Sequence, residues 1–247
     1  MSSPGTKAAM GRVLLVCNDL PAIQQLDEGM QQFAIVTEVC NDAGLAVRQL
    51  NRQKFEAVIV DLGLAQASEI LEQVRLSPFN RTAVTFAIVA PREPGSVEIP
   101  QDQVRPNFVL EKPLSASSVG RTLKVAFGSI VRERRRSFRC PVTIPAVIFA
   151  DGTKSDCQVV NLSEGGMAIA ESPALKPGGQ VKVIFTLPGQ IDFFAFESEV
   201  CWYDDKGRAG LRSLNIPPEQ HSALQNWLSI KLEEDLPESV ADQFRRT

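Results

Sequence analysis

The chain has 247 residues, of which 44% are hydrophobic and 22% are charged, and its formal net charge is −3. These values are ordinary for a globular protein, so they exclude a disordered or fibrous chain, and the length favours two domains. Residues 1–12 are polar and no apolar run approaches the roughly 18 residues that span a bilayer, so we expect no membrane partner and a cytoplasmic location.

Residues 11–128 alternate short apolar runs with amphipathic segments, which is typical of βα units around a parallel sheet. Five strands are expected at the apolar runs, namely residues 12–16, 34–39, 57–60, 83–90 and 107–110. Four helices are expected between them, at residues 21–32, 42–53, 65–76 and 115–127, with Ser115 and Asn41 or Asp42 as caps. Residues 91–106 hold four prolines, which predict a mostly irregular loop.

A charged run at residues 132–139 (RERRRSFR) separates this half from a second one, and we place the boundary near residues 129–131. Six strand-like runs follow, namely residues 141–150, 154–162, 167–171, 180–187, 191–203 and 208–214. Because turn formers such as Asp151-Gly152 separate them, a small antiparallel barrel or sandwich is expected. A helix from residue 217 to about 231 could cover one barrel end with Leu224, Trp227, Leu228 and Ile230.

Cysteine and histidine content narrows the chemistry that this chain can perform. The five cysteines are widely spaced, without a CxxC pair, so we expect them to be small buried apolar side chains. His221 is the only histidine, which leaves little material for a histidine-based metal site or catalytic triad. We therefore expect a protein that is not an enzyme, with no catalytic residues and no resident cofactor.

Two short motifs stand in order in the second half. Arg135 and Arg139 lie four residues apart with Arg134 before them, and Asn161, Ser163 and Gly166 follow about twenty residues later. The pair resembles the RxxxR and (D/N)xSxxG motifs of the PilZ family, over about residues 131–232. This resemblance implies a six-stranded antiparallel β-barrel with a C-terminal helix, in which these six residues bind cyclic di-GMP. Residues 129–140 would then be an arginine-rich linker and ligand-binding arm, 141–232 the barrel with its helix, and 233–247 a tail.

The residue types suit that ligand. An arginine can form paired hydrogen bonds with phosphate oxygens or with guanine O6 and N7, and its plane can stack on a purine. Asn161 and Ser163 lie two apart on a strand, so both can face one guanine edge, and Gly166 would allow ligand to approach the backbone. A second interpretation remains open, because arginine runs are often solvated linkers and NxS-Gly-Gly is common in turns. Some PilZ-like domains have also lost ligand binding.

The first half resembles response-regulator receiver domains, which implies a flavodoxin-like fold with a five-stranded parallel sheet over residues 11–128. Asp61 matches the phosphoacceptor position, and Asp19 and Lys112 match the receiver pocket. If the receiver is active, Asp19 and Asp61 would share a Mg²⁺ ion. Ala90 replaces the expected small hydroxyl residue, and the usual loop after the acceptor is missing, so we expect a degenerate receiver used for docking or for a homodimer. The alternative interpretation is structural, with Asp61 as a helix cap paired to Lys112.

The leading hypothesis is a cyclic di-GMP effector whose ligand changes a contact with an unidentified protein partner. One alternative is a response regulator controlled by phosphorylation of Asp61, and another is a PilZ-like scaffold without ligand. Nucleic acid is not an expected partner, because residues 140–247 carry nine Lys or Arg against fifteen Asp or Glu, a net charge of −6.

Overall fold

The computed structural model describes residues 9–91, 104–234, 236, 238, 240 and 241. The chain forms two compact units that divide between Arg134 and Arg135. We call the first the sheet unit and the second, Arg135–Glu234, the barrel unit. No helix in the described part of the chain combines the length and apolar character needed to cross a membrane.

The sheet unit contains a five-stranded parallel sheet in the order β2-β1-β3-β4-β5. This is the flavodoxin-like order that receiver domains share. Its strands are β1 (Gly11–Val16), β2 (Ile35–Cys40), β3 (Ala57–Asp61), β4 (Val84–Val89) and β5 (Phe108–Glu111). Its helices are α1 (Leu20–Gln31), α2 (Ala43–Leu50), α3 (Ala67–Leu76) and the first part of α4 (Ala116–Ser137).

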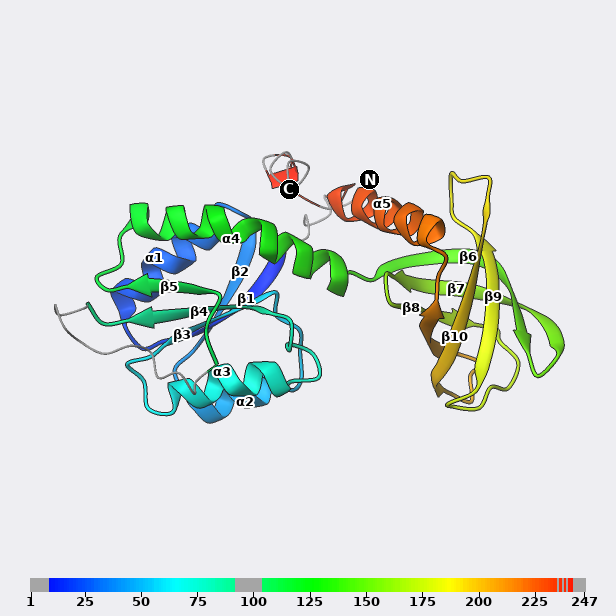
Figure 1. The fold of residues 1–247 in the computed structure, drawn as a ribbon, viewed down its shortest axis with the longest axis horizontal. Helices are drawn as coiled ribbons and strands as arrows, with labels where there is room; N and C mark the ends of the chain where they lie inside the picture. The colour runs from blue at the N-terminus through cyan, green and yellow to red at the C-terminus, as the bar shows by residue number, and fades with distance from the viewer. Residues whose placement is uncertain (1–8, 92–103, 235, 237, 239, 242–247) are drawn as a thin grey trace, which may run out of the picture. The chain divides into compact units, whose positions relative to one another are not determined.

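Helices cover both faces of this sheet, α1 and α4 on one side and α2 and α3 on the other (Figure 1). Strand β3 is buried along its whole length, as expected for a central strand covered on both faces. Side chains of Asp19 and Asp42 accept hydrogen bonds from the first turns of α1 and α2, so Asp42 is the cap of α2. The expected irregular loop at residues 91–106 falls largely on residues 92–103, which lie outside the described residues.

The barrel unit closes six antiparallel strands in the order β10-β11-β8-β7-β6-β9. The strands are β6 (Cys140–Ala150), β7 (Thr153–Ser163), β8 (Gly166–Ala170), β9 (Gln180–Thr186), β10 (Phe193–Tyr203) and β11 (Ala209–Asn215). Asp151 and Gly152 join β6 to β7 with positive φ angles of 49° and 77°, which suits the tight hairpin expected there. Both halves of the predicted fold are therefore confirmed.

Three details differ from the sequence-based expectation. Helix α4 continues ten residues beyond its expected end at Phe127, so the arginine run to Ser137 is helical. In α5 (Pro218–Glu234) Leu224, Trp227 and Leu228 are buried as expected, but Ile230 is 48% exposed and Leu232 is buried in its place. Four cysteines are buried, whereas Cys201 is exposed.

Candidate ligand site

The pairing of β6 with β7 brings the two sequence motifs to one end of the barrel. Cys140, the first residue of β6, lies opposite Leu162. Because the strands are antiparallel, Arg139 precedes this pair on one strand and Ser163 follows it on the other. The arginine motif and the polar motif therefore leave the barrel side by side, as a shared site requires.

The polar motif forms the tight connection between β7 and β8. Asn161 is half-buried between Pro141 and Ala168 on the neighbouring strands. Ser163 is buried, and its Oγ donates a hydrogen bond to the Gly166 carbonyl oxygen at 2.9 Å. The hydroxyl proton of Ser163 thus holds the turn, and only its acceptor lone pairs remain for a ligand.

Packing against a neighbouring strand explains why residue 166 is glycine, and the sequence alone did not indicate this contact. A Cβ atom at this position would lie 2.1 Å from the backbone oxygen of Leu211 on β11. The adjacent turn is also joined to β11, because the Ser213 amide donates to the Gly165 carbonyl oxygen at 3.1 Å. Strand packing alone therefore requires glycine here, whether or not a ligand approaches the backbone.

The arginines of the barrel unit differ in burial. Arg135 is half-buried in the last turns of α4, and its burial lowers the pKa of the guanidinium, an effect that the Glu233 carboxylate opposes. Arg139 is exposed, and it forms no ion pair with another residue of the described chain. Phe138, which lies between the helix end and β6, is buried and fixes this short segment. The arm therefore carries one half-buried and one exposed arginine, and the backbone of Arg139 precedes the pair of Cys140 with Leu162.

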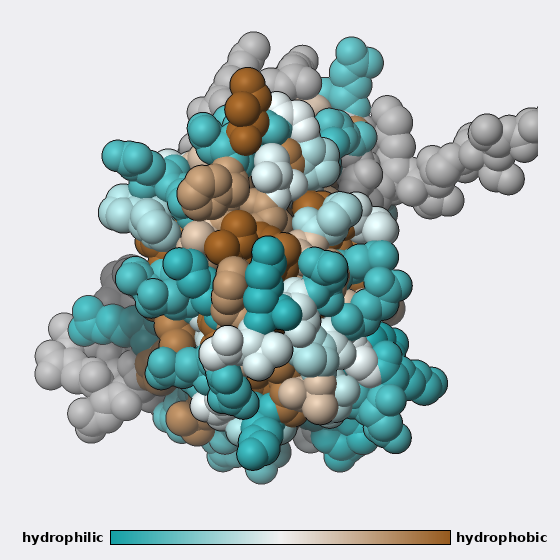
Figure 2. Space-filling view, turned by 90° about the vertical axis from the view of Figure 1, so that its right-hand side faces the viewer, coloured by the Kyte–Doolittle hydropathy of each residue, from teal (hydrophilic) through white to brown (hydrophobic). Residues whose placement is uncertain are grey.

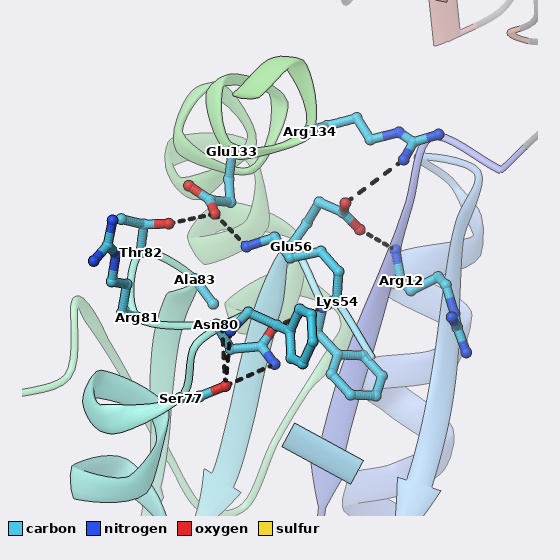
Figure 3. A network of polar contacts seen from close by, with 12 residues as sticks. Arg12, Lys54, Glu56, Ser77, Asn80, Arg81, Thr82, Ala83, Glu133 and Arg134 are labelled. Carbon is cyan, nitrogen blue, oxygen red and sulfur yellow. Dashed lines mark hydrogen bonds and ion pairs between the residues drawn. The ribbon is translucent and has the colours of Figure 1, made fainter. Parts of the chain in front are cut away.

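Arg134 belongs to the sheet unit, where a buried carboxylate holds it (Figure 3). Its Nη1 lies 3.7 Å from Oε1 of Glu56, and the other oxygen of Glu56 accepts the Arg12 backbone N–H at 2.7 Å. The neighbouring Glu133, only 3% exposed, pairs with Lys54 and accepts a hydrogen bond from Thr82 at 2.6 Å. Sequence reasoning missed both glutamates, because their partners lie far away along the chain.

Helix α5 also contacts the motif turn. Gln225 donates a hydrogen bond to the Glu164 carboxylate, and the His221 Nε2 lies 3.4 Å from the same carboxylate oxygen. Glu164 occupies an unspecified position of the motif, so its role was not visible in the sequence. The turn between β7 and β8 is thus held by β11 and by α5.

The receiver-like pocket lies at the carboxyl ends of the strands in the sheet unit. Lys112 Nζ is 2.7 Å from Oδ2 of Asp61 and 3.0 Å from Oδ2 of Asp19, so the three predicted residues do meet. The hydrogen bond from Lys112 lowers the pKa of Asp19, and the bond to Asp61 raises the pKa of Lys112. Burial raises the pKa of the neighbouring Cys17 thiol, which contacts Asp61, to about 11.

The pocket carries its own cation in the form of Lys112. Asp61 accepts a hydrogen bond from the Gly63 backbone, whereas the cap position of α3 is Gln66, so Asp61 does not cap that helix. Among the described residues no group of three or more His, Cys, Asp or Glu side chains is arranged to hold a metal ion. The two carboxylates fit Mg²⁺ poorly while Lys112 contacts both, and the Mg²⁺ site at Asp19 and Asp61 stays a prediction.

Comparisons with known proteins give separate matches to the two units. The Bacillus subtilis inhibitor of motility MotI/DgrA is 20% identical with a TM-score of 0.34, and the match covers 38% of this chain and 48% of that one. The PilZ domain of CeSA from a cellulose-synthesizing bacterium is 21% identical, with a TM-score of 0.33 and coverage of 39% and 99%. The receiver domain of the Pseudomonas aeruginosa PAO1 sensor histidine kinase PA1611 is 18% identical, with a TM-score of 0.40 and coverage of 49% and 99%.

The family assignment comes from the sequence of the barrel unit. The PilZ domain family matches residues 133–229, which include both motifs. No curated protein matches the chain. Residues 133–229 therefore match the PilZ domain family, and they follow a sheet unit with the strand order of receiver domains.

Proposed function

We propose that this chain is an effector that binds cyclic di-GMP at the barrel end where the two motifs meet. The observation that carries the proposal is the register of β6 and β7, which sets Arg139 beside the Asn161–Ser163 turn. Had the motifs been at opposite barrel ends, one ligand could not have contacted both.

The charges at this site favour an anionic dinucleotide. Arg139 is exposed, and Arg135 is partly desolvated, a cost that an anion would offset. Each guanidinium can form a fork to a phosphate or to the O6 and N7 atoms of guanine, and it can stack on the base. Asn161 offers an amide for the guanine edge, and Ser163 offers an acceptor.

Arg134 is the sixth candidate residue, and its ion pair with Glu56 bears on how the site would work. If Arg134 contacts the ligand, it must leave a carboxylate that is 2% exposed and belongs to the sheet unit. Ligand binding would then loosen the end of α4 from Glu56. We propose this exchange as the step that changes the contact with a protein partner.

The sheet unit is proposed to act as a degenerate receiver for docking or dimerisation. Ala90 follows β4 where a phosphoryl-binding hydroxyl was expected, and Lys112 already pairs with both Asp61 and Asp19. Phosphorylation of Asp61 is the second candidate function, favoured by the meeting of these three residues at the carboxyl ends of the strands. We expect neither unit to bind nucleic acid.

Calorimetric titration of the full chain with cyclic di-GMP tests the first candidate. We expect micromolar or tighter binding, and Arg139→Ala should weaken it at least tenfold, about 1.4 kcal/mol. Arg208→Ala is the matched control, because Arg208 is exposed and pairs only locally with Asp204. If the titration gives no heat and excess ligand does not compete, the alternative of a PilZ-like scaffold that binds no ligand is favoured.

Treatment with a small phosphodonor and Mg²⁺ tests the second candidate. A degenerate receiver gains no mass, whereas a working one gains a base-labile phosphoryl group that Asp61→Asn abolishes. Intact-mass spectrometry reads both outcomes directly.

A further inference from the structure

An apolar face covers part of the barrel exterior, away from the motif turn. Side chains alternate between the inside and the outside of each strand, and paired residues share a face. The registers of β6, β9 and β10 therefore align two outward rows, Pro145–Thr186–Phe193 and Val147–Ile184–Ala195. All six are exposed or half-buried and none is charged, and on β7 the two rows continue with the polar side chains of Gln158 and Asp156.

A hollow of about 500 Å³ opens in this face. It is lined by Ile144, Pro145, Ala146, Val147, Ile184 and Phe185, with Thr186, Cys157 and the carboxylate of Asp156 completing its wall. Its size and apolar lining suit an inserted aliphatic or aromatic side chain.

The hairpin between β9 and β10 places two apolar side chains beside this hollow. Ile191 is 98% exposed and Phe193 is 63% exposed. The hairpin is anchored, because the Trp227 indole N–H donates to the Pro188 carbonyl oxygen at 3.2 Å and Gln220 accepts the Ala195 N–H at 3.0 Å. Figure 2 faces the barrel side and shows hydrophobic residues gathered between hydrophilic ones. Hydrophobic residues also project at the top of this view. In Figure 1 the hairpin between β9 and β10 ends at the top of the barrel.

Exposure of such side chains on an anchored hairpin marks an interaction surface. The barrel is closed, so it has no free strand edge for a partner strand to pair with. A partner must therefore pack on the outward face itself.

The charges around the face are complementary to those of a second copy of this chain. The next outward row toward the start of β9 holds two lysines and one glutamate, Lys154–Phe149–Lys182–Glu197. The opposite border, at the hairpin tip, holds Asp192. A twofold axis that crosses the strands would place the Lys182 end of one copy against the Asp192 tip of the other, and the apolar rows between them.

We propose that the outward face of β6, β9 and β10 forms a symmetric dimer contact, with Ile191 and Phe193 of each copy packed on the apolar face of the other. The contact pairs apolar with apolar surface and opposite charges at both ends. It does not depend on cyclic di-GMP binding.

Sedimentation of the full chain over a range of concentrations tests the proposal. We expect a monomer–dimer equilibrium, and the double variant Ile191→Asp with Phe193→Asp should weaken dimerisation by about a hundredfold, as loss of central apolar contacts does. Ile230→Asp is the matched control, because Ile230 is also exposed but lies on α5, outside the face. Circular dichroism checks that every variant folds.

A charge exchange identifies the partner surface. Lys182→Glu and Asp192→Lys should each weaken self-association, because each places like charges at both ends of the contact. Mixing the two variants should restore dimers, since the two ends of a mixed dimer again carry opposite charges. A wild-type chain that stays monomeric at all concentrations, a dimer insensitive to the Ile191 and Phe193 changes, or a mixture that fails to recover would overturn the proposal.

Discussion

The receiver-like pocket and the PilZ motif site both gather charged residues, but they differ in how those charges are balanced. In the pocket, Lys112 contacts the carboxylates of Asp19 and Asp61, so one of the two negative charges is balanced from within. At the barrel end, Arg139 is exposed and the polar turn beside it carries amide and hydroxyl groups. Both sets match family motifs in sequence.

The difference teaches that matching residues do not suffice to define a working site. Carboxylates that already share a lysine have less electrostatic need for a bound cation, whereas an exposed guanidinium such as that of Arg139 favours an anion. The same contrast holds within the arginine run, because Arg134 is engaged by Glu56 of the sheet unit and Arg139 is exposed.

The largest expected loss of stability comes from removing the buried carboxylate of Glu133. Glu133→Ala leaves Lys54 and Thr82 without their shared acceptor, and loss of one partner of a buried pair costs about 3 kcal/mol or more. Urea denaturation of the full chain should show an earlier transition of the sheet unit. Glu38→Ala is the control, because the pair of Glu38 with Arg12 is more exposed, and a change of less than about 1 kcal/mol is expected.

Gly166→Ala tests whether the motif turn is limited by packing. The added methyl group would lie 2.1 Å from the Leu211 oxygen, so β8 and β11 must separate, at a cost of about 1–3 kcal/mol. Gly165→Ala is the matched control, since a methyl group at Gly165 would meet no atom within 4 Å. Equal thermal stability of the two variants would contradict the packing account.

Glu56→Gln should free Arg134 from its ion pair and leave its guanidinium available to the proposed ligand. The amide keeps an acceptor for the Arg12 N–H but removes the ion pair with Arg134, so cyclic di-GMP affinity should rise by a few fold. Glu38→Gln should leave the affinity unchanged. If both variants bind like the wild type while Arg139→Ala does not, Arg134 takes no part in binding.

The smallest effect is the pH dependence of the receiver-like pocket. Because the folded pKa of Asp19 is lowered, its stabilisation is present above about pH 4 and is lost as the pH falls through the folded value. The raised pKa of Lys112 acts in the opposite sense, and its stabilisation is present below about pH 10 and is lost as the pH rises through the folded value. Asp19→Asn should flatten the acid side of a melting-temperature profile, and an unchanged profile would show that this ion pair contributes nothing.

Local patterns predicted most of the fold. Short apolar runs predicted the strands of both units, and the turn formers between the six runs of the second half predicted a small antiparallel barrel or sandwich. The end of α4 could not be placed, because a charged run is equally compatible with a linker and a helix, and buried Glu133 extends the helix through contacts with Lys54 and Thr82.

The candidate site was predictable only as a set of residues. The sequence predicted Arg139, Asn161 and Gly166 as candidate ligand residues, but not the close approach of Gly166 to the Leu211 oxygen. Nor could it indicate that Glu164 meets α5 or that Glu56 holds Arg134, because these contacts join segments far apart in the chain. Such contacts depend on the packing of the folded units.

Hydrogen–deuterium exchange of the full chain, with and without saturating cyclic di-GMP, tests the central claim most directly. Joint contact of one ligand with the arm and the turn predicts protection in residues 135–140 and 161–166 together, while peptides around Asp61 and Lys112 stay unchanged. Protection of only one of the two barrel segments, or protection confined to the receiver-like pocket, would contradict it.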